Sequence, residues 1–563
     1  MSAKYFMIQG TSSSAGKSSV TAGFLRYFAN KGLNCSPFKP QNMSLNSYVT
    51  DDGFEIARSQ SMQAEAAGIK PTKFMNPILI KPSENNLMHL IVNGKFFGNM
   101  TFQEYNSKKA QFIKVIKKSF EELLDKNDIV IIEGAGSPAE INLYDADVAN
   151  MGFAELYDIP VILVADIERG GVFASIYGTI MLLPDKWKKL IKGFVINKFR
   201  GDESILKPGI EIIEKKIGIL CLGVVPYIKN LYIEAEDSLS LEYYDNIKKI
   251  LPDKNNLTAN NNFRKFKSEA LKNKNSRFKI GIVQLDSISN FNEFDPLFLD
   301  DRFDASFIKN PPAQDIDISR YLNGFDIIII PGTKSTIPDL KKIKKNGLFN
   351  CIKNYRNNSD GIIIGICGGF QMMGKNINDP MRLESQESTI EGLGFFDMET
   401  VLRKEKILFN RKYKINNELG FFTDKRYEEI VLDGYEIHNG VSSFNFNTAD
   451  AKEADIKTEE IFSDFAGKGI ISISRDSENI LIGTYVHGLF ENDIFRNIIV
   501  SALVKKKIKN KDYRNKRIQN LIINENITRH HDFYYKKIKN YNFELLAEVL
   551  EKNINMTLVE SIF

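Results

Sequence analysis

A cysteine and a distant histidine stand in stretches of the chain whose composition suits nucleophilic chemistry. Cys367 lies between an apolar run, residues 361–365, and a glycine pair, which predicts a strand, a tight turn and a helix. The dipole of such a helix stabilises a thiolate at its N-terminus. His487 ends a second apolar run, with glycine after it. A buried structural cysteine is the alternative, but the flanking glycines favour acyl transfer through a thioester.

The turn around Cys367 resembles the nucleophile turn of the class I glutamine amidotransferases. In those enzymes the cysteine attacks the side-chain amide of glutamine and releases ammonia. Upstream, a buried-strand pattern over residues 325–330 leads into a loop at Gly332. The resemblance implies that this loop and the backbone N–H of Gly368 form the oxyanion hole, because backbone donors fixed where charge develops stabilise the transition state strongly.

One position departs from the pattern of that class. Many of its members carry a glutamate two residues after the catalytic histidine, and this chain has Leu489 there. Glu491 is near in sequence, but nothing else assigns it that role. The sequence therefore leaves open which group orients His487.

A phosphate-binding loop is predicted near the start of the chain. A buried-strand pattern over residues 4–9 runs into a stretch of glycine and serine, and a helix pattern follows over residues 20–29. In such loops the backbone N–H groups and the helix dipole face the phosphates, a lysine adds charge and a hydroxyl can ligate Mg²⁺. The residues predicted to bind nucleotide here are Gly10, Gly16, Lys17, Ser18 and Ser19.

The loop has one residue more than the standard form, and in this it resembles dethiobiotin synthetase and its relatives. The resemblance implies ATP and Mg²⁺ as cofactors, with Lys39 as a second phosphate contact. It makes Ser18, Glu133 and Glu55 the Mg²⁺ ligands, although Glu55 could equally be an exposed residue at a helix start. It also implies that Asn197 contacts the adenine base, with simple strand-end polarity as the alternative.

Polar blocks with glycine recur at predicted strand ends along nearly the whole chain. They lie at residues 38–47, 75–82, 133–143, 164–174, 197–202 and 434–440. Through these blocks the chain resembles the cobyric acid synthases, the glutamine-dependent amidases of cobalamin assembly. The block that begins Phe38-Lys-Pro-Gln41-Asn42-Met43 separates this family from the cobyrinate a,c-diamide synthases. His438 lies in the last block and has two possible roles. It could contact the substrate or the domain seam, or it could make a structural hydrogen bond.

The resemblance implies a reaction and its substrates. ATP would activate the b, d, e and g carboxylates of adenosylcobyrinic acid a,c-diamide as acyl phosphates, and ammonia from glutamine would convert them to amides, giving adenosylcobyric acid. The alternatives are cobyrinate a,c-diamide synthase or another amidotransferase of the same two modules, such as one acting on a cell-wall precursor. A third is a partitioning-type ATPase fused to an inert binding domain, which the Cys367 and His487 pair disfavours.

Composition is that of an ordinary cytoplasmic enzyme. The chain has 563 residues, enough for several domains, and a net charge of only +4, which does not argue for nucleic acid. Its four cysteines show no CxxC spacing, so neither a disulfide framework nor a zinc site is indicated. No apolar run is long enough for a membrane span. The partners expected are small molecules, glutamine and a corrinoid carboxylate, and the oligomeric state is left open.

Alternating strand and helix patterns predict an α/β fold with two doubly wound domains. We expect a P-loop synthetase domain over residues 1–240 and a glutamine amidotransferase domain over residues 277–504. Between them, residues 241–276 are rich in lysine and asparagine and are predicted to be a polar linker. Residues 505–563 are expected to form a basic tail with a short amphipathic helix over residues 543–554.

Overall fold

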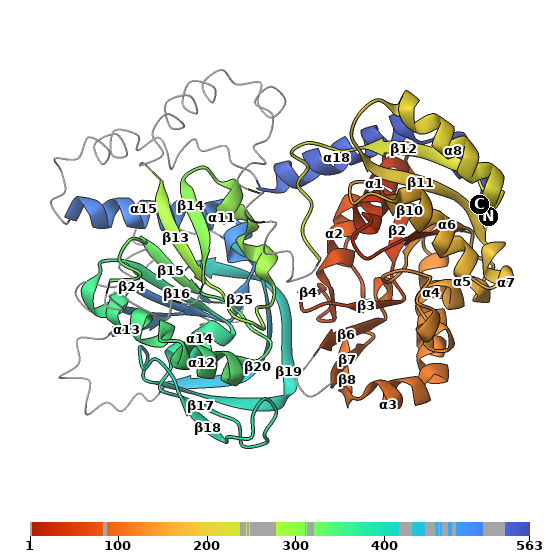
Figure 1. The fold of residues 1–563 in the computed structure, drawn as a ribbon. Helices are drawn as coiled ribbons and strands as arrows, with labels where there is room; N and C mark the ends of the chain where they lie inside the picture. Colours follow the sequence, from red (N-terminus) through yellow and green to blue (C-terminus); the bar gives the residue numbers. More distant parts are fainter. Residues whose placement is uncertain are drawn as a thin grey trace. The chain divides into compact units, whose positions relative to one another are not determined.

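Two compact units make up the chain (Figure 1). The first comprises Met1–Glu236 together with Lys537–Phe563, and the second comprises Asp237–Lys536. The computed structural model describes residues 3–82, 87–236, 244, 247, 277–309, 311, 320–415, 431–444, 457–460, 462–463, 471–475, 480–509 and 535–563. The two ends of the chain thus belong to the same unit.

The first unit is built on a sheet of six strands that all run parallel. In spatial order these are β12 (Cys221–Pro226), β11 (Ile191–Phe199), β10 (Val161–Asp166), β1 (Lys4–Gly10), β9 (Ile129–Glu133) and β2 (Cys35–Phe38). Parallel pairing requires crossover connections, and helices supply them. They are α1 (Lys17–Asn30), α4 (Lys109–Leu124), α5 (Met151–Leu156), α6 (Val172–Leu182), α7 (Asp185–Lys188) and α8 (Glu203–Ile217).

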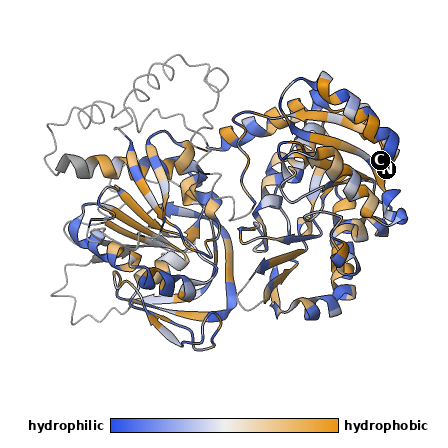
Figure 2. Ribbon diagram, viewed as in Figure 1, coloured by the Kyte–Doolittle hydropathy of each residue, from blue (hydrophilic) through white to orange (hydrophobic). Residues whose placement is uncertain are grey.

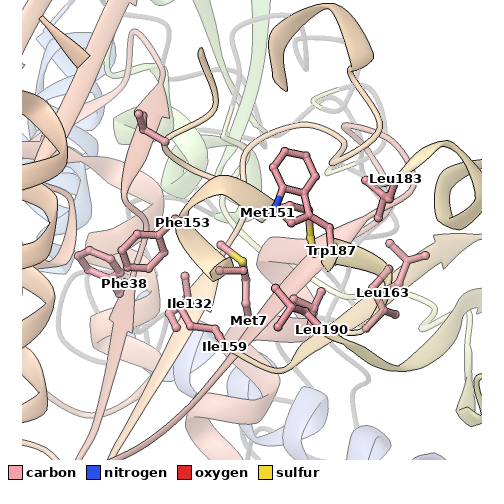
Figure 3. Packing of buried hydrophobic residues seen from close by; sticks show 14 of the residues in the cluster. Met7, Phe38, Ile132, Met151, Phe153, Ile159, Leu163, Leu183, Trp187 and Leu190 are labelled. Carbon is pink, nitrogen blue, oxygen red and sulfur yellow. The ribbon is translucent and has the colours of Figure 1, made fainter. Parts of the chain in front are cut away.

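Alternate side chains of β1 enter two different hydrophobic clusters. Met7 packs in one cluster with Phe38 and Trp187 (Figure 3), whereas Phe6 and Ile8 pack in the other. Successive residues of a strand point to opposite faces, so both faces of this sheet are covered. A strand buried on both faces favours apolar residues at successive positions, and residues 5–8 of β1 form such a run.

Two small sheets and two helices follow β2 in the sequence. One sheet contains β3 (Gln41–Met43), β6 (Ile78–Pro82), β7 (Met88–Val92) and β8 (Lys95–Met100), and the other pairs β4 (Ser47–Val49) with β5 (Glu55–Ala57). The helices are α2 (Arg58–Ala66) and α3 (Phe102–Ser107). This region carries the polar block at residues 38–47.

The last two helices complete the core of the first unit. These are α18 (Tyr535–Asn553) and α19 (Met556–Ser561). Leu550 is fully buried against α1, where a Cβ added to Gly23 would lie 2.6 Å from its Cδ1 atom. The expectation of a separate tail over residues 505–563 is therefore wrong for residues 537–563, and the helix is longer than predicted. Residues 510–534 of that tail lie outside the described residues.

The second unit has a mostly parallel sheet of its own. Its order is β14 (Phe303–Ile308), β13 (Phe278–Val283), β15 (Ile327–Ile330), β16 (Ile362–Ile366), β24 (Ile480–Thr484), β23 (Ile471–Arg475) and β21 (Lys457–Glu460), and only the pairings of β23 are antiparallel. The helices of this unit include α11 (Asp295–Leu299), α12 (Thr336–Lys345), α13 (Leu348–Asn358), α14 (Gly368–Met373) and α15 (Asp493–Lys509). The predicted α/β class is confirmed for both units, and hydrophobic residues concentrate along the central strands (Figure 2).

A second sheet of this unit was not predicted. It contains β18 (Thr389–Glu391), β17 (Asn376–Asn378), β19 (Met398–Ile415), β20 (Val431–Phe444) and β25 (Val486–His487), with β22 (Phe462–Ser463) paired to β19. The strand β25 brings His487 beside Tyr435 of β20. This sheet therefore helps to position the histidine.

The predicted linker, residues 241–276, lies outside the described residues except for Tyr244 and Ile247. Tyr244 is buried in the second unit, with its ring centroid 4.5 Å from that of Phe298. Its hydroxyl donates to the carbonyl oxygen of Phe291 at 3.1 Å. Packing of the second unit thus includes a residue well before the predicted boundary at residue 277.

Candidate active sites

Cys367 is the single residue between strand β16 and helix α14. Its backbone has φ 52° and ψ −110°, a conformation that a non-glycine residue adopts only when the surrounding structure imposes it. The crowding is visible at Gly369, where an added Cβ would lie 2.0 Å from the carbonyl oxygen of Ile330. The predicted strand, tight turn and helix are confirmed, and the second glycine is needed because backbone packs on backbone there.

Glu293 is the partner that orients His487. Nδ1 of His487 lies 2.9 Å from Oε1 of Glu293, and the N–H of Gly488 donates to the other carboxylate oxygen at 3.2 Å. The His487 and Glu293 side chains are each 1% exposed. Burial lowers the pKa of His487, but the charge of Glu293 and the nearby thiol of Cys367 outweigh burial and raise it to about 10. A buried carboxylate in this position fixes the ring and stabilises the imidazolium.

The cysteine, the histidine and the Gly332 loop meet at one point. A Cβ added to Gly332 would lie 2.9 Å from Cε1 of His487 and 3.6 Å from Cβ of Cys367. The thiol is close enough to affect the histidine pKa, yet Nε2 of His487 has no partner with hydrogen-bond geometry among the described residues. Such bonds are often long in ligand-free enzymes and tighten when substrate binds. Nε2 can therefore exchange a proton with the thiol or with a leaving group.

The two glycines predicted for the oxyanion hole both lie beside Cys367. Gly368 begins α14, so its N–H has no acceptor within the helix. A Cβ on Gly368 would lie 2.6 Å from Cγ2 of Thr333, the residue that follows Gly332. The Thr333 hydroxyl donates to Asp339 and lies 3.1 Å from the carbonyl oxygen of Ser287, which fixes the loop. The role of the two N–H groups stays a prediction.

The predicted phosphate-binding loop connects β1, which ends at Gly10, with α1, which begins at Lys17. Gly16 has φ +97°, and a Cβ there would lie 2.2 Å from Nδ2 of Asn197, so both conformation and space require glycine. Nζ of Lys17 donates to the carbonyl oxygen of Gly136 at 2.7 Å. It also donates to carbonyl oxygens of the loop, including that of Ser12 at 3.1 Å.

Ser18 and Glu133, the predicted Mg²⁺ ligands, place two side-chain oxygens close together. The Ser18 hydroxyl donates to Oε1 of Glu133 at 3.0 Å, and Nζ of Lys39 lies 2.8 Å from the same oxygen. Adjacent ligands around an octahedral Mg²⁺ at about 2.1 Å stand about 3 Å apart, so the two residues suit neighbouring positions. Among the described residues, no group of three or more His, Cys, Asp or Glu side chains could hold a metal by itself.

Two other predicted residues, Glu55 and Asn197, have contacts that bear on their roles. Glu55 pairs with Lys81 at 2.7 Å and accepts from the Ser47 hydroxyl at 2.8 Å, so its role as a Mg²⁺ ligand gains no support and stays a prediction. Asn197 donates from Nδ2 to the carbonyl oxygen of Ala15 at 2.9 Å, so it supports the phosphate loop, and its contact to adenine stays a prediction. Ser19 lies in the first turn of α1.

Sequence reasoning missed two carboxylates. Glu293 lies in the short 3-10 helix Phe291–Phe294, in a stretch whose asparagines and phenylalanines match no motif. Glu236 places Oε1 2.7 Å from Nζ of Lys39. Burial raises the pKa of Glu236, but the charge of Lys39 and hydrogen bonds to the carboxylate outweigh it and lower the pKa to about 2. The only signal for Glu236 is a pair of acidic residues two positions apart, Glu234 and Glu236, which is too common to predict a site.

His438 is buried in the second unit and makes contacts through both ring nitrogens. Its Nδ1 lies 2.7 Å from the carbonyl oxygen of Gly440, and its Nε2 lies 3.2 Å from Oε2 of Glu436. The ring stacks on Tyr485 with the centroids 3.8 Å apart. Of the two roles considered for His438, these contacts favour the structural one.

Comparison with known proteins identifies both domains. Residues 6–241 match the model of the CobQ/CobB/MinD/ParA nucleotide binding domain, and residues 279–495 match that of the CobB/CobQ-like glutamine amidotransferase domain. The chain is 39% identical over 556 residues to the cobyric acid synthase of Clostridium acetobutylicum, which covers 99% of this chain and 98% of that protein. The chain belongs to the cobyric acid synthase family.

Other cobyric acid synthases match along the same length. The protein of Thermoanaerobacter sp. (strain X514) is 40% identical, in an alignment that covers 99% of this chain and 98% of that protein. The protein of Listeria monocytogenes is also 40% identical, and the alignment covers 99% of this chain and 96% of that protein. As a member of the cobyric acid synthase family, the chain is a glutamine-dependent amidating ligase with a nucleotide-binding domain, and the predicted resemblance is confirmed. None of the described helices has the length and apolarity that crossing a membrane requires.

Proposed function

We propose that this enzyme amidates the b, d, e and g carboxylates of adenosylcobyrinic acid a,c-diamide, using ATP and glutamine, to give adenosylcobyric acid. The observation that carries the proposal is the identity of about 40% with curated cobyric acid synthases along 99% of the chain. The two sites supply the two half-reactions that such a synthase needs. Its location in the cytoplasm stays a prediction.

Ammonia is released at the site in the second unit. The raised pKa of His487 keeps the proton on its imidazole, and the sulfur of Cys367 attacks the amide carbon of glutamine as the thiolate. The backbone N–H of Gly368 and the Gly332 loop stabilise the oxyanion. The imidazolium, held by Glu293, gives its proton to the departing nitrogen, and ammonia leaves behind a thioester. Water then hydrolyses the thioester to glutamate and regenerates the thiol.

The carboxylate is activated at the site in the first unit. A carboxylate oxygen of the corrinoid attacks the γ-phosphorus of ATP, ADP leaves, and an acyl phosphate remains. The loop N–H groups and the ammonium groups of Lys17 and Lys39 neutralise charge on the transferring phosphoryl group. Ser18 and Glu133 would hold Mg²⁺, whose charge would be shared with the phosphate oxygens. Ammonia then displaces phosphate from the acyl carbon, and a carboxamide results.

A substrate panel tests the assignment. Purified protein is incubated with Mg²⁺, ATP and glutamine, together with adenosylcobyrinic acid a,c-diamide, with cobyrinic acid or with a cell-wall precursor carboxylate, and products are counted by mass spectrometry. The proposal expects successive amidation of the diamide at the b, d, e and g positions. Amidation that stops after the a and c positions of cobyrinic acid would instead indicate a cobyrinate a,c-diamide synthase. Amidation of the cell-wall precursor alone would indicate an amidotransferase that acts on that precursor.

A further inference from the structure

A carboxylate of the chain itself lies in the activation site. Oε1 of Glu236 accepts hydrogen bonds from Nζ of Lys39 at 2.7 Å, Nδ2 of Asn42 at 2.9 Å and the Ser59 hydroxyl at 3.1 Å. Its other oxygen, Oε2, lies 3.5 Å from the hydroxyl of Ser18 in the phosphate-binding loop. All these donors belong to the first unit.

The donors that hold this carboxylate are buried and have further partners. Lys39 and Asn42 are each 3% exposed, and Ser59 is 6% exposed. Asn42 also donates to Oε1 of the Gln60 side chain at 3.0 Å, and Lys39 keeps its pair with Glu133. Three buried donors that converge on one oxygen, one of them charged, are the chemistry that binds a carboxylate.

The pocket lies where the activation reaction needs its nucleophile. Acyl phosphate formation begins with a carboxylate oxygen next to the γ-phosphate, and the γ-phosphate is expected beside Ser18 and Lys39. We infer that Lys39, Asn42 and Ser59 form the subsite for the acceptor carboxylate of the corrinoid, and that Glu236 occupies this subsite until the acceptor replaces it. The inference rests on the proposed function, because it names the residues that hold that substrate.

Glu236 can leave without unfolding the segment that carries it. Two residues earlier, Glu234 is fixed by Arg58 at 2.8 and 3.0 Å and by Lys539 at 2.9 Å. The Glu234 side chain is 2% exposed, whereas that of Glu236 is 26% exposed. Glu234 thus anchors the segment, and only the more exposed carboxylate has to move. Lys39 stays paired with Glu133 after the exchange.

The expected consequence is competition. A ligand whose site is free only part of the time binds with an affinity reduced by that fraction, so removing the competing carboxylate should tighten acceptor binding by about tenfold or more. Removing one donor of the subsite should weaken acceptor binding by about tenfold, the value of a hydrogen bond to a charged group. The two substitutions therefore act in opposite directions on the same equilibrium.

Calorimetry on the full-length protein measures this equilibrium. Adenosylcobyrinic acid a,c-diamide is titrated into protein that holds Mg²⁺ and a non-hydrolysable ATP analogue, for the unmodified chain and for Glu236→Ala, Glu236→Gln and Asn42→Ala. Glu211→Gln, an exposed change on α8, serves as the charge-matched control. We expect tighter corrinoid binding for both Glu236 variants, weaker binding for Asn42→Ala and no change for the control. Affinity for the Mg²⁺–nucleotide complex is measured in parallel and should change by less than about threefold in the Glu236 variants.

Each other outcome decides against the inference in a distinct way. Corrinoid binding that is unchanged or weaker in the Glu236 variants, with loss of Mg²⁺–nucleotide affinity, would make Glu236 a metal ligand and overturn the subsite. Unchanged binding by Asn42→Ala would overturn the assignment of the donors. A corrinoid that fails to bind even the unmodified protein would overturn the proposed function, and the acceptor subsite with it.

Discussion

Replacing Glu293 with glutamine should disable the glutaminase half-reaction while leaving the rest of the enzyme intact. The carboxylate makes two contacts, to Nδ1 of His487 at 2.9 Å and to the N–H of Gly488 at 3.2 Å. The glutamine side chain has nearly the same shape, so the cavity stays filled. It has no charge, and the imidazolium that forms during the reaction loses its partner.

The magnitude follows from the burial of this pair. Both side chains are 1% exposed, so water cannot replace the lost carboxylate. Breaking a buried, hydrogen-bonded ion pair costs about 3–5 kcal/mol. If that loss falls on the transition state, where the imidazolium is present, kcat for glutamine hydrolysis drops by about 10²–10⁴.

The assay is glutamate release from glutamine, followed for the unmodified protein, for Glu293→Gln and for Glu491→Gln. Glu491 is the acidic residue that lies nearest after His487 in the sequence, and the same change of charge there should alter kcat by less than about threefold. A thermal melt of each variant shows that the fold is kept. If Glu293→Gln retained full activity, or if Glu491→Gln lost it instead, the assignment of the orienting group would be refuted.

Three further outcomes follow from the structure. Gly16→Ala would place a Cβ 2.2 Å from a side-chain nitrogen and force φ +97° on alanine, so nucleotide affinity measured with a fluorescent analogue should fall more than about tenfold. Leu550→Ala should lower the free energy of unfolding of the first unit by about 2–5 kcal/mol in urea, while Lys552→Ala on the exposed side should change it by less than about 0.5 kcal/mol. The pKa of His487 rises from 6.5 to about 10 on folding, so its stabilising contribution is full below pH 6.5 and is lost as pH rises toward 10. Unfolding of the second unit at several pH values should show that loss, and Glu293→Gln should flatten it.

The parts of both sites that follow local rules were predictable from the sequence. Gly16 ends the loop that follows strand β1, and Lys17 and Ser18 begin helix α1, an order that is typical of loops that bind phosphate at a helix N-terminus. The glycines after Cys367 allow other backbone segments to pack closely against the turn. This packing holds the Cys367 backbone at φ 52°. In each case neighbouring residues in the chain determine the geometry.

The parts that depend on contacts between distant segments were not predictable. Glu293 reaches His487 across 194 positions of sequence, and Glu236 reaches Lys39 across 197. No periodicity or spacing in one sequence records such a pair. Helix α18 was assigned to a tail for the same reason, because its apolar face with Leu550 indicated that the helix packs but not on which unit. Glu55 follows a family pattern and pairs with Lys81 at 2.7 Å, and its role as a Mg²⁺ ligand stays a prediction.

The central claim is that one chain carries two separable chemistries, nitrogen release at Cys367 and carboxylate activation at the phosphate-binding loop. It is tested most directly by amidation of adenosylcobyrinic acid a,c-diamide with the Cys367→Ala protein, supplied in turn with glutamine and with ammonium. The account predicts that glutamine no longer supports amidation, whereas ammonium supports it at the rate of the unmodified protein. Loss of amidation with both nitrogen sources, in a protein that still melts cooperatively, would contradict it.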